Sequence, residues 1–133
     1  MDLFDVDDRT ARLFVLGDVL AILAFVLVGE LSHGIDPLAR PLYVAETALP
    51  FVVGWAFAGS ALGAYSVRAR ESLRVGLPRA FVAWLAADAV AQALRALPFF
   101  HGDAALTFYL VAAAFGGALL LGWRALATTV LAR

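Results

Sequence analysis

Four apolar segments limit this chain to a small set of folds. They cover residues 13–31, 48–65, 80–97 and 104–123. Each is close to the ~20 residues that a helix needs to span the ~30 Å of hydrocarbon in a bilayer. Only helices and closed barrels satisfy their own backbone in lipid, and these segments lack the alternation of barrel strands. Because the connections are short, the sequence predicts an all-α fold, a four-transmembrane-helix antiparallel bundle in a single integral membrane domain over residues 1–133.

The overall composition agrees with a membrane protein and argues against several other classes. Hydrophobic residues make up 63% of the chain and charged residues only 16%, which is far more apolar than an ordinary soluble domain. The net charge of −1 gives no reason to expect nucleic acid as a partner. There is no cysteine, and the common catalytic and phosphate-binding motifs are absent. We therefore expect no enzyme activity, no cofactor and no metal, and a lipid bilayer as the main partner.

The distribution of arginine predicts the orientation in the membrane. With four spans, both termini and the middle connection lie on the same side. Arg40 is the only basic residue in the connections of the opposite side, and Arg95 lies inside the third segment. Basic residues collect on the cytoplasmic side, so we expect a multi-pass protein of the cell membrane with both termini in the cytoplasm. The eight arginines of the predicted cytoplasmic side are Arg9, Arg12, Arg68, Arg70, Arg74, Arg79, Arg124 and Arg133.

Polar residues inside the apolar segments are the first candidates for a functional site. Asp88, Gln92 and Arg95 follow each other at spacings of four and three, which places them on one face of a helix. Ionisable groups at membrane depth are costly and rarely face lipid. Counting from the segment ends puts Asp18 at a similar depth to Asp88, with Arg124 within reach. We predict an inner cluster of these three residues, which is either a clasp between helices or a proton- or cation-coupled site.

A second polar group is predicted near the outer face. Glu30 ends the first segment and Glu46 precedes the second, both at the height of Arg95. Gln92 would connect this outer cluster to the inner one. If both clusters face the interior, they form a polar track across most of the membrane. The alternative for Arg95 is that its side chain simply reaches the outer headgroups.

Small residues and two histidines complete the set of candidates. Gly59 and Gly63, like Gly116 and Gly117 with the alanines four residues before them, have the spacing that allows close helix packing in lipid. Such faces serve either packing within the bundle or a homo-oligomer. His33 and His101 lie in the outer connections near carboxylates, but their spacing matches no metal motif. The alternatives are a divalent metal site in the outer connections and ordinary turn and helix-cap roles, and we expect the latter.

Several short motifs resemble a known family. They are Gly17-Asp18, Phe25…Gly29…Ser32-His33-Gly34, Pro50-Phe-x-x-Gly54-Trp55, Gly63-Ala-Tyr65, Arg95 and Leu121-Gly-Trp-Arg124. In this order and spacing they are similar to Domain of Unknown Function 3054, a family of small membrane proteins from haloarchaea and actinobacteria. The resemblance runs from about Leu13 to Arg124. It implies a four-helix membrane protein with these polar membrane residues, and it supplies no activity.

Ahead of an intramembrane enzyme, which is the least favoured alternative, two functions are compatible with the sequence. The first is a small transporter or channel-like protein, in which a small solute or ion moves along the polar residues. The second is an accessory or scaffold subunit, in which the same charges hold the helices together.

Overall fold

The computed structural model describes residues 9–100 and 106–131, and their regular structure is helical. Three helical segments in this part of the chain are long and apolar enough to cross a membrane: α1 (Arg9–Ser32), α2 (Pro41–Ala61) and Leu106–Leu131. The last is continuous and comprises α5 (Leu106–Val111), the π-helical turn η1 (Ala112–Gly116) and α6 (Gly117–Leu131). The remaining helices are α3 (Val67–Glu71) and α4 (Leu73–Arg95). The predicted all-α fold with membrane-compatible helices is therefore confirmed.

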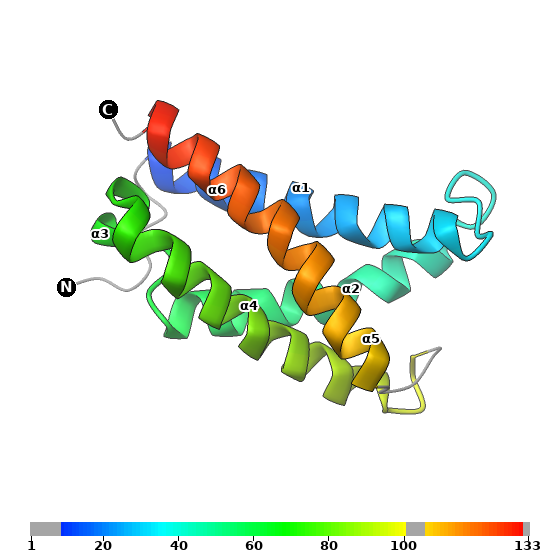
Figure 1. The fold of residues 1–133 in the computed structure, drawn as a ribbon. Coiled ribbons are helices and arrows are strands. Elements are labelled where there is room, and N and C mark those ends of the chain that lie inside the picture. The colour runs from blue at the N-terminus through cyan, green and yellow to red at the C-terminus, as the bar shows by residue number, and fades with distance from the viewer. Residues whose placement is uncertain (1–8, 101–105, 132–133) are drawn as a thin grey trace.

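The long helices pack in two neighbouring pairs. α2 lies along α4 and α1 lies along α6, while α1 also contacts α2 and α4 also contacts α6. α1 begins and α6 ends at the end of the molecule that carries α3 (Figure 1). The turn from α1 to α2 and residues 96–100, which follow α4, lie at the opposite end. We call these the α3 end and the loop end.

The pair Gly59 and Gly63, predicted to pack helices, instead forms the end of α2. Gly63 lies beyond the helix with a φ of 77°, a left-handed conformation that favours glycine. The N–H groups of Gly63 and Ala64 donate to the carbonyls of Ser60 and Gly59 at 3.4 and 2.9 Å, which is the Schellman arrangement of a helix C-terminus. A Cβ on Gly59 would meet the ring of Trp55 in its own helix. The prediction of a packing face here was wrong because the helix stops before its second glycine.

Close approach of two helices occurs at Gly54 in the middle of α2. A Cβ at this position would lie 2.5 Å from the carbonyl oxygen of Ala87 in α4. Gly116 and Gly117 do lie at a contact between helices, where their Cβ positions are 2.5 and 3.4 Å from ring atoms of Trp84. In the structure, these two glycines pack against α4 of the same chain. Small residues thus make room for a backbone in one place and for a large ring in another.

A layer of aromatic rings fills the middle of the molecule. Phe25, Phe51 and Trp84, from α1, α2 and α4, are at most 3% exposed. Their ring centroids are 5.3 to 6.0 Å apart. The indole Nε1 of Trp84 donates to the carbonyl of Ala112 at 2.9 Å, and this carbonyl belongs to the π-helical turn. The aromatic layer therefore joins all four long helical segments and separates the α3 end from the loop end.

Candidate functional site

Asp18 and Arg124 form a buried ion pair on the α3 side of the aromatic layer. Their side chains are 0% and 1% exposed. The Nε and Nη2 groups of Arg124 donate to Oδ1 and Oδ2 of Asp18 at 2.9 and 2.5 Å. The remaining Nη1 group donates to the carbonyl of Ala64 at 2.6 Å. Such a two-pronged, charge-assisted pair is among the stronger hydrogen-bonded arrangements in proteins.

Aromatic side chains supply further donors around this pair. The indole Nε1 of Trp123 donates to Oδ1 of Asp18 at 3.1 Å, and the hydroxyl of Tyr65 donates to Oδ2. The Tyr65 oxygen in turn accepts from Nε1 of Trp55 at 2.7 Å. Each carboxylate oxygen therefore accepts two hydrogen bonds. We call these five residues, with Arg124 and Asp18 at their centre, the clasp.

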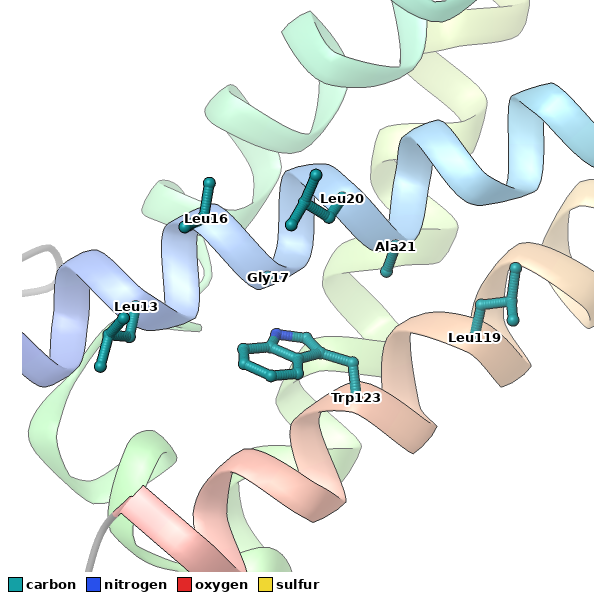
Figure 2. Close-up of a pocket in the computed structure, with 7 residues that line it drawn as sticks. All are labelled: Leu13, Leu16, Gly17, Leu20, Ala21, Leu119 and Trp123. Carbon is teal, nitrogen blue, oxygen red and sulfur yellow. The ribbon is translucent and has the colours of Figure 1, made fainter.

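Glycines allow the chain to build the clasp. A Cβ on Gly17 would overlap the ring of Trp123, so the absence of a side chain there lets the indole reach Asp18. Figure 2 shows this ring lying across from Gly17, between α1 and α6. The turn at Gly63 likewise folds the chain after α2 back toward the bundle, where Tyr65 is buried. The neighbouring groove of about 390 Å³ has apolar walls, formed by Leu13, Leu16, Leu20, Ala21 and Leu119 together with Gly17 and Trp123.

Asp88 lies apart from the clasp, which divides the predicted inner cluster. Its side chain is fully buried on α4, and Oδ1 accepts from Nε2 of Gln92 at 3.1 Å. The depth of Asp88 was predicted by counting from residue 80, whereas α4 begins at Leu73. At 1.5 Å per residue this difference moves Asp88 about 10 Å along the helix. Asp88 therefore lies one turn beyond Trp84 toward the loop end, while Asp18 lies on the other side of the aromatic layer.

Two of the four predicted outer residues line a cavity at the loop end. Its volume is about 670 Å³, and Glu30 from α1 and Arg95 from α4 both line it. The guanidinium carbon of Arg95 lies 4.2 Å from the ring centroid of Phe108. Glu46 and Gln92 are not among the lining residues. The other polar residues of the lining are Ser32, His33, Tyr43, Thr47 and Thr107, and the apolar ones include Phe25, Val26, Phe51, Val111 and Phe115.

The histidines do not form a metal centre in the part of the chain that the structure describes. His33 is exposed at the rim of the loop-end cavity. His101 lies outside the described residues. Among the described residues, no group of three potential metal ligands comes together.

Sequence reasoning missed three members of the clasp, namely Trp55, Tyr65 and Trp123. From the sequence, these aromatic residues were identified only as parts of short motifs, without polar roles. A signal was available, because a buried carboxylate and guanidinium need more donors and acceptors than one pair supplies. All three aromatic residues also stand in the short motifs that carry the family resemblance.

Comparison with known proteins agrees with that resemblance. The family model described as "Protein of unknown function (DUF3054)" matches residues 15–127, which include the clasp, Asp88, Gln92 and Arg95. No curated protein and no solved structure matches this chain. Since the match covers most of its length, the chain belongs to the DUF3054 family.

Proposed function

We propose that this protein is a four-span membrane protein that binds a small solute in the loop-end cavity as the first step of its transport. The observation that carries the proposal is the cavity itself. Its volume of about 670 Å³ lies within the range of 300–1,000 Å³ that is typical of ligand pockets. It sits between helices, where ligand sites of helical bundles occur. Charged and aromatic side chains converge on it from separate helices.

The environment of α4 supports it as the fourth span. Its 23 residues correspond to about 34 Å of helix, enough to cross the hydrocarbon. Phe81, Val82 and Val90 are 37–54% exposed, so an apolar surface faces outward. Asp88 and Gln92 are at most 6% exposed and face protein. The polar residues that lower the average hydropathy of α4 would therefore be kept from lipid.

The orientation follows from the arginines at the α3 end. Arg9 and Arg12 begin α1, Arg68 and Arg70 belong to α3, and Arg74 stands in the first turn of α4. A basic end favours the cytoplasmic side, so the loop-end cavity would open toward the outside. A reporter fused after Arg133 should then be active in the cytoplasm. An external signal from that fusion would overturn the topology.

The lining of the cavity suits a small organic molecule with an apolar body and an anionic group. Four phenylalanine rings belong to its apolar wall, and the guanidinium of Arg95 is held against one of them, Phe108. Arginine is well suited to bind a carboxylate through two parallel hydrogen bonds. Glu30, on the opposite helix, would repel solutes with a second negative charge. We therefore propose a monocarboxylate with an aromatic or branched body as the solute class.

A scaffold or accessory subunit is the second candidate, and the clasp favours it. The clasp ties α1 to α6 and to the turn after α2, and both oxygens of Asp18 are fully engaged. Such a group serves structure rather than ion passage. The clasp alone would suffice for a protein that only holds partners in the membrane.

Thermal unfolding of the purified protein in detergent separates the two candidates. Benzoate should raise the melting temperature of the wild type, because a ligand that binds only the folded state stabilises it. Neutral benzamide should have a smaller effect. Arg95→Gln should lose the response to benzoate, and Arg40→Gln, an exposed arginine at the same end, should keep it. If benzoate shifts the wild type and Arg95→Gln equally, or shifts neither, the solute site is wrong.

A further inference from the structure

Asp88 and Gln92 present two buried oxygens that accept no hydrogen bond from the residues that the structure describes. The two residues stand one turn apart on α4 and are 0% and 6% exposed. One hydrogen bond joins them, from Gln92 Nε2 to Asp88 Oδ1. Among the described residues, nothing donates to Asp88 Oδ2 or to Gln92 Oε1. Buried polar atoms without partners are rare in folded proteins, so this pair calls for an explanation.

A single proton satisfies both atoms at once. A carboxylic acid and a primary amide form a cyclic pair with two hydrogen bonds, one from the amide N–H and one from the acid O–H. The first is already present at 3.1 Å. The second requires only that Oδ2 carry the proton and donate toward Oε1. An ionised carboxylate in the same place would remain buried with one neutral donor, which is unfavourable.

We propose that Asp88 and Gln92 form a proton-binding site in the middle of the membrane. Oδ2 of Asp88 takes a proton from hydronium, so that an O–H bond of hydronium breaks, an O–H bond to Oδ2 forms, and neutral water leaves. The negative charge of the carboxylate disappears. Gln92 is the positioning residue, because it holds Oδ1 through its N–H and receives the new O–H at its carbonyl oxygen. Deprotonation reverses the step and returns the proton to water.

The charged neighbours of Asp88 do not replace this proton. Arg124 is bonded to Asp18 within the clasp, and the hydroxyl of Tyr109 donates to the carbonyl of Leu85. Arg95 stands on α4 itself, about two turns beyond Asp88, where it lines the cavity. The other titratable groups on the elements packed around α4 are Glu30, Tyr43 and Glu46 at the loop end, Arg68, Arg70 and Glu71 on α3, and Arg9 and Arg12 at the start of α1.

Because of where the site lies, a proton bound there changes the charge near the loop-end cavity. Asp88 lies between the aromatic layer and Arg95, so its charge acts on the same region as the guanidinium. Protonation removes a negative charge near the cavity and favours an anion there, which links proton uptake to solute uptake. This link rests on the proposed function, whereas the proton site does not.

Infrared spectroscopy of the protein in detergent, without solute, tests the proton site. The wild type at mildly acidic pH should show the carbonyl band of a buried, protonated carboxylic acid, and Asp88→Asn should lose it. Asp36→Asn, which changes an exposed carboxylate, should keep the band. Gln92→Leu keeps the acid but removes its acceptor, so it should shift the band. This variant also serves if Asp88→Asn fails to fold.

The pH dependence supplies the second measurement. The wild type should become less stable over the pH range in which the infrared band disappears, because the buried acid becomes charged there. Asp88→Asn should fold and lack this loss, because its amide N–H takes the place of the acid O–H. The proposal is overturned if the wild type shows no carbonyl band that the substitution Asp88→Asn removes. So does stabilisation by sodium over potassium with the band absent, since a metal cation would then occupy the site.

The outcome is independent of the solute experiment. If benzoate has no effect at any pH but the band is present, the proton site stands and the solute site fails. If both hold, benzoate binding should weaken as the pH rises through the titration of the band in the wild type. In Asp88→Asn it should not change with pH over that range.

Discussion

The clasp makes a quantitative prediction about single and double substitutions. Asp18→Asn removes the charge that opposes Arg124, whose side chain is 1% exposed and cannot lose its proton. Removing one partner of a buried ion pair typically costs about 3–5 kcal/mol of unfolding free energy, and we expect the upper half of this range. Arg124→Met should cost less, about 3 kcal/mol, since Asp18 can take up a proton once its counter-ion has gone.

The double substitution is the decisive case. It removes both charges and leaves mainly neutral groups without partners: the carbonyl of Ala64, and part of the bonding of Tyr65 and Trp123. At about 1 kcal/mol for each neutral hydrogen bond, the double variant should lose about 2–3 kcal/mol. This loss is no larger than that of either single substitution, so the two effects should be strongly non-additive.

Equilibrium unfolding in mixed detergent micelles, followed by far-ultraviolet circular dichroism, measures these differences. Asp36→Asn and Arg74→Met are the matched controls, since both residues are exposed, and each should change stability by less than about 0.5 kcal/mol. Two results would refute the reasoning. One is a cost below about 1 kcal/mol for both single clasp substitutions, as at a surface ion pair. The other is an additive double variant.

The same assay tests the two glycines that position the clasp. Gly17→Ala should lose about 1–2 kcal/mol, because the new Cβ overlaps the Trp123 ring and the strain outweighs the gain in helix propensity. Gly122→Ala on α6, whose Cβ would have open space, should instead gain up to about 1 kcal/mol; equal effects at the two positions would contradict the packing argument. Gly63→Ala should cost about 1–2 kcal/mol because its φ of 77° is unfavourable for a residue with a Cβ, and an unchanged stability would show that the turn adapts.

The sequence was informative about helices and about which polar residues are buried, and less so about their depth. Long apolar segments and the cost of charge in lipid predicted helices and a role for Asp18, Arg124 and Asp88. The depth of Asp88 required the true start of α4. A first turn that contains Arg74 and Gly76, after the N-cap Ser72, concealed this start within an apparent loop. The end of α2 depended on the conformation of Gly63, which spacing alone cannot distinguish from a packing motif.

The two buried acids, Asp18 and Asp88, differ more in the number of hydrogen bonds they accept than in their depth. Asp18 accepts four hydrogen bonds, two of them from a guanidinium, so a proton or a metal ion would have to displace an existing donor. Within residues 9–100 and 106–131, Asp88 accepts one hydrogen bond and keeps an oxygen without a donor, next to an amide oxygen in the same condition. Full satisfaction favours a rigid joint, and incomplete satisfaction favours a site that binds.

The same contrast predicts where the molecule opens. A solute passing from the cavity must separate Phe25, Phe51 and Trp84, since these rings fill the bundle between the cavity and the α3 end. The clasp ties α1, α6 and the turn after α2 together at the α3 end. The loop end already encloses a cavity. If the protein transports a solute as proposed, we therefore expect its first movement at the loop end, with the helices pivoting about the clasp.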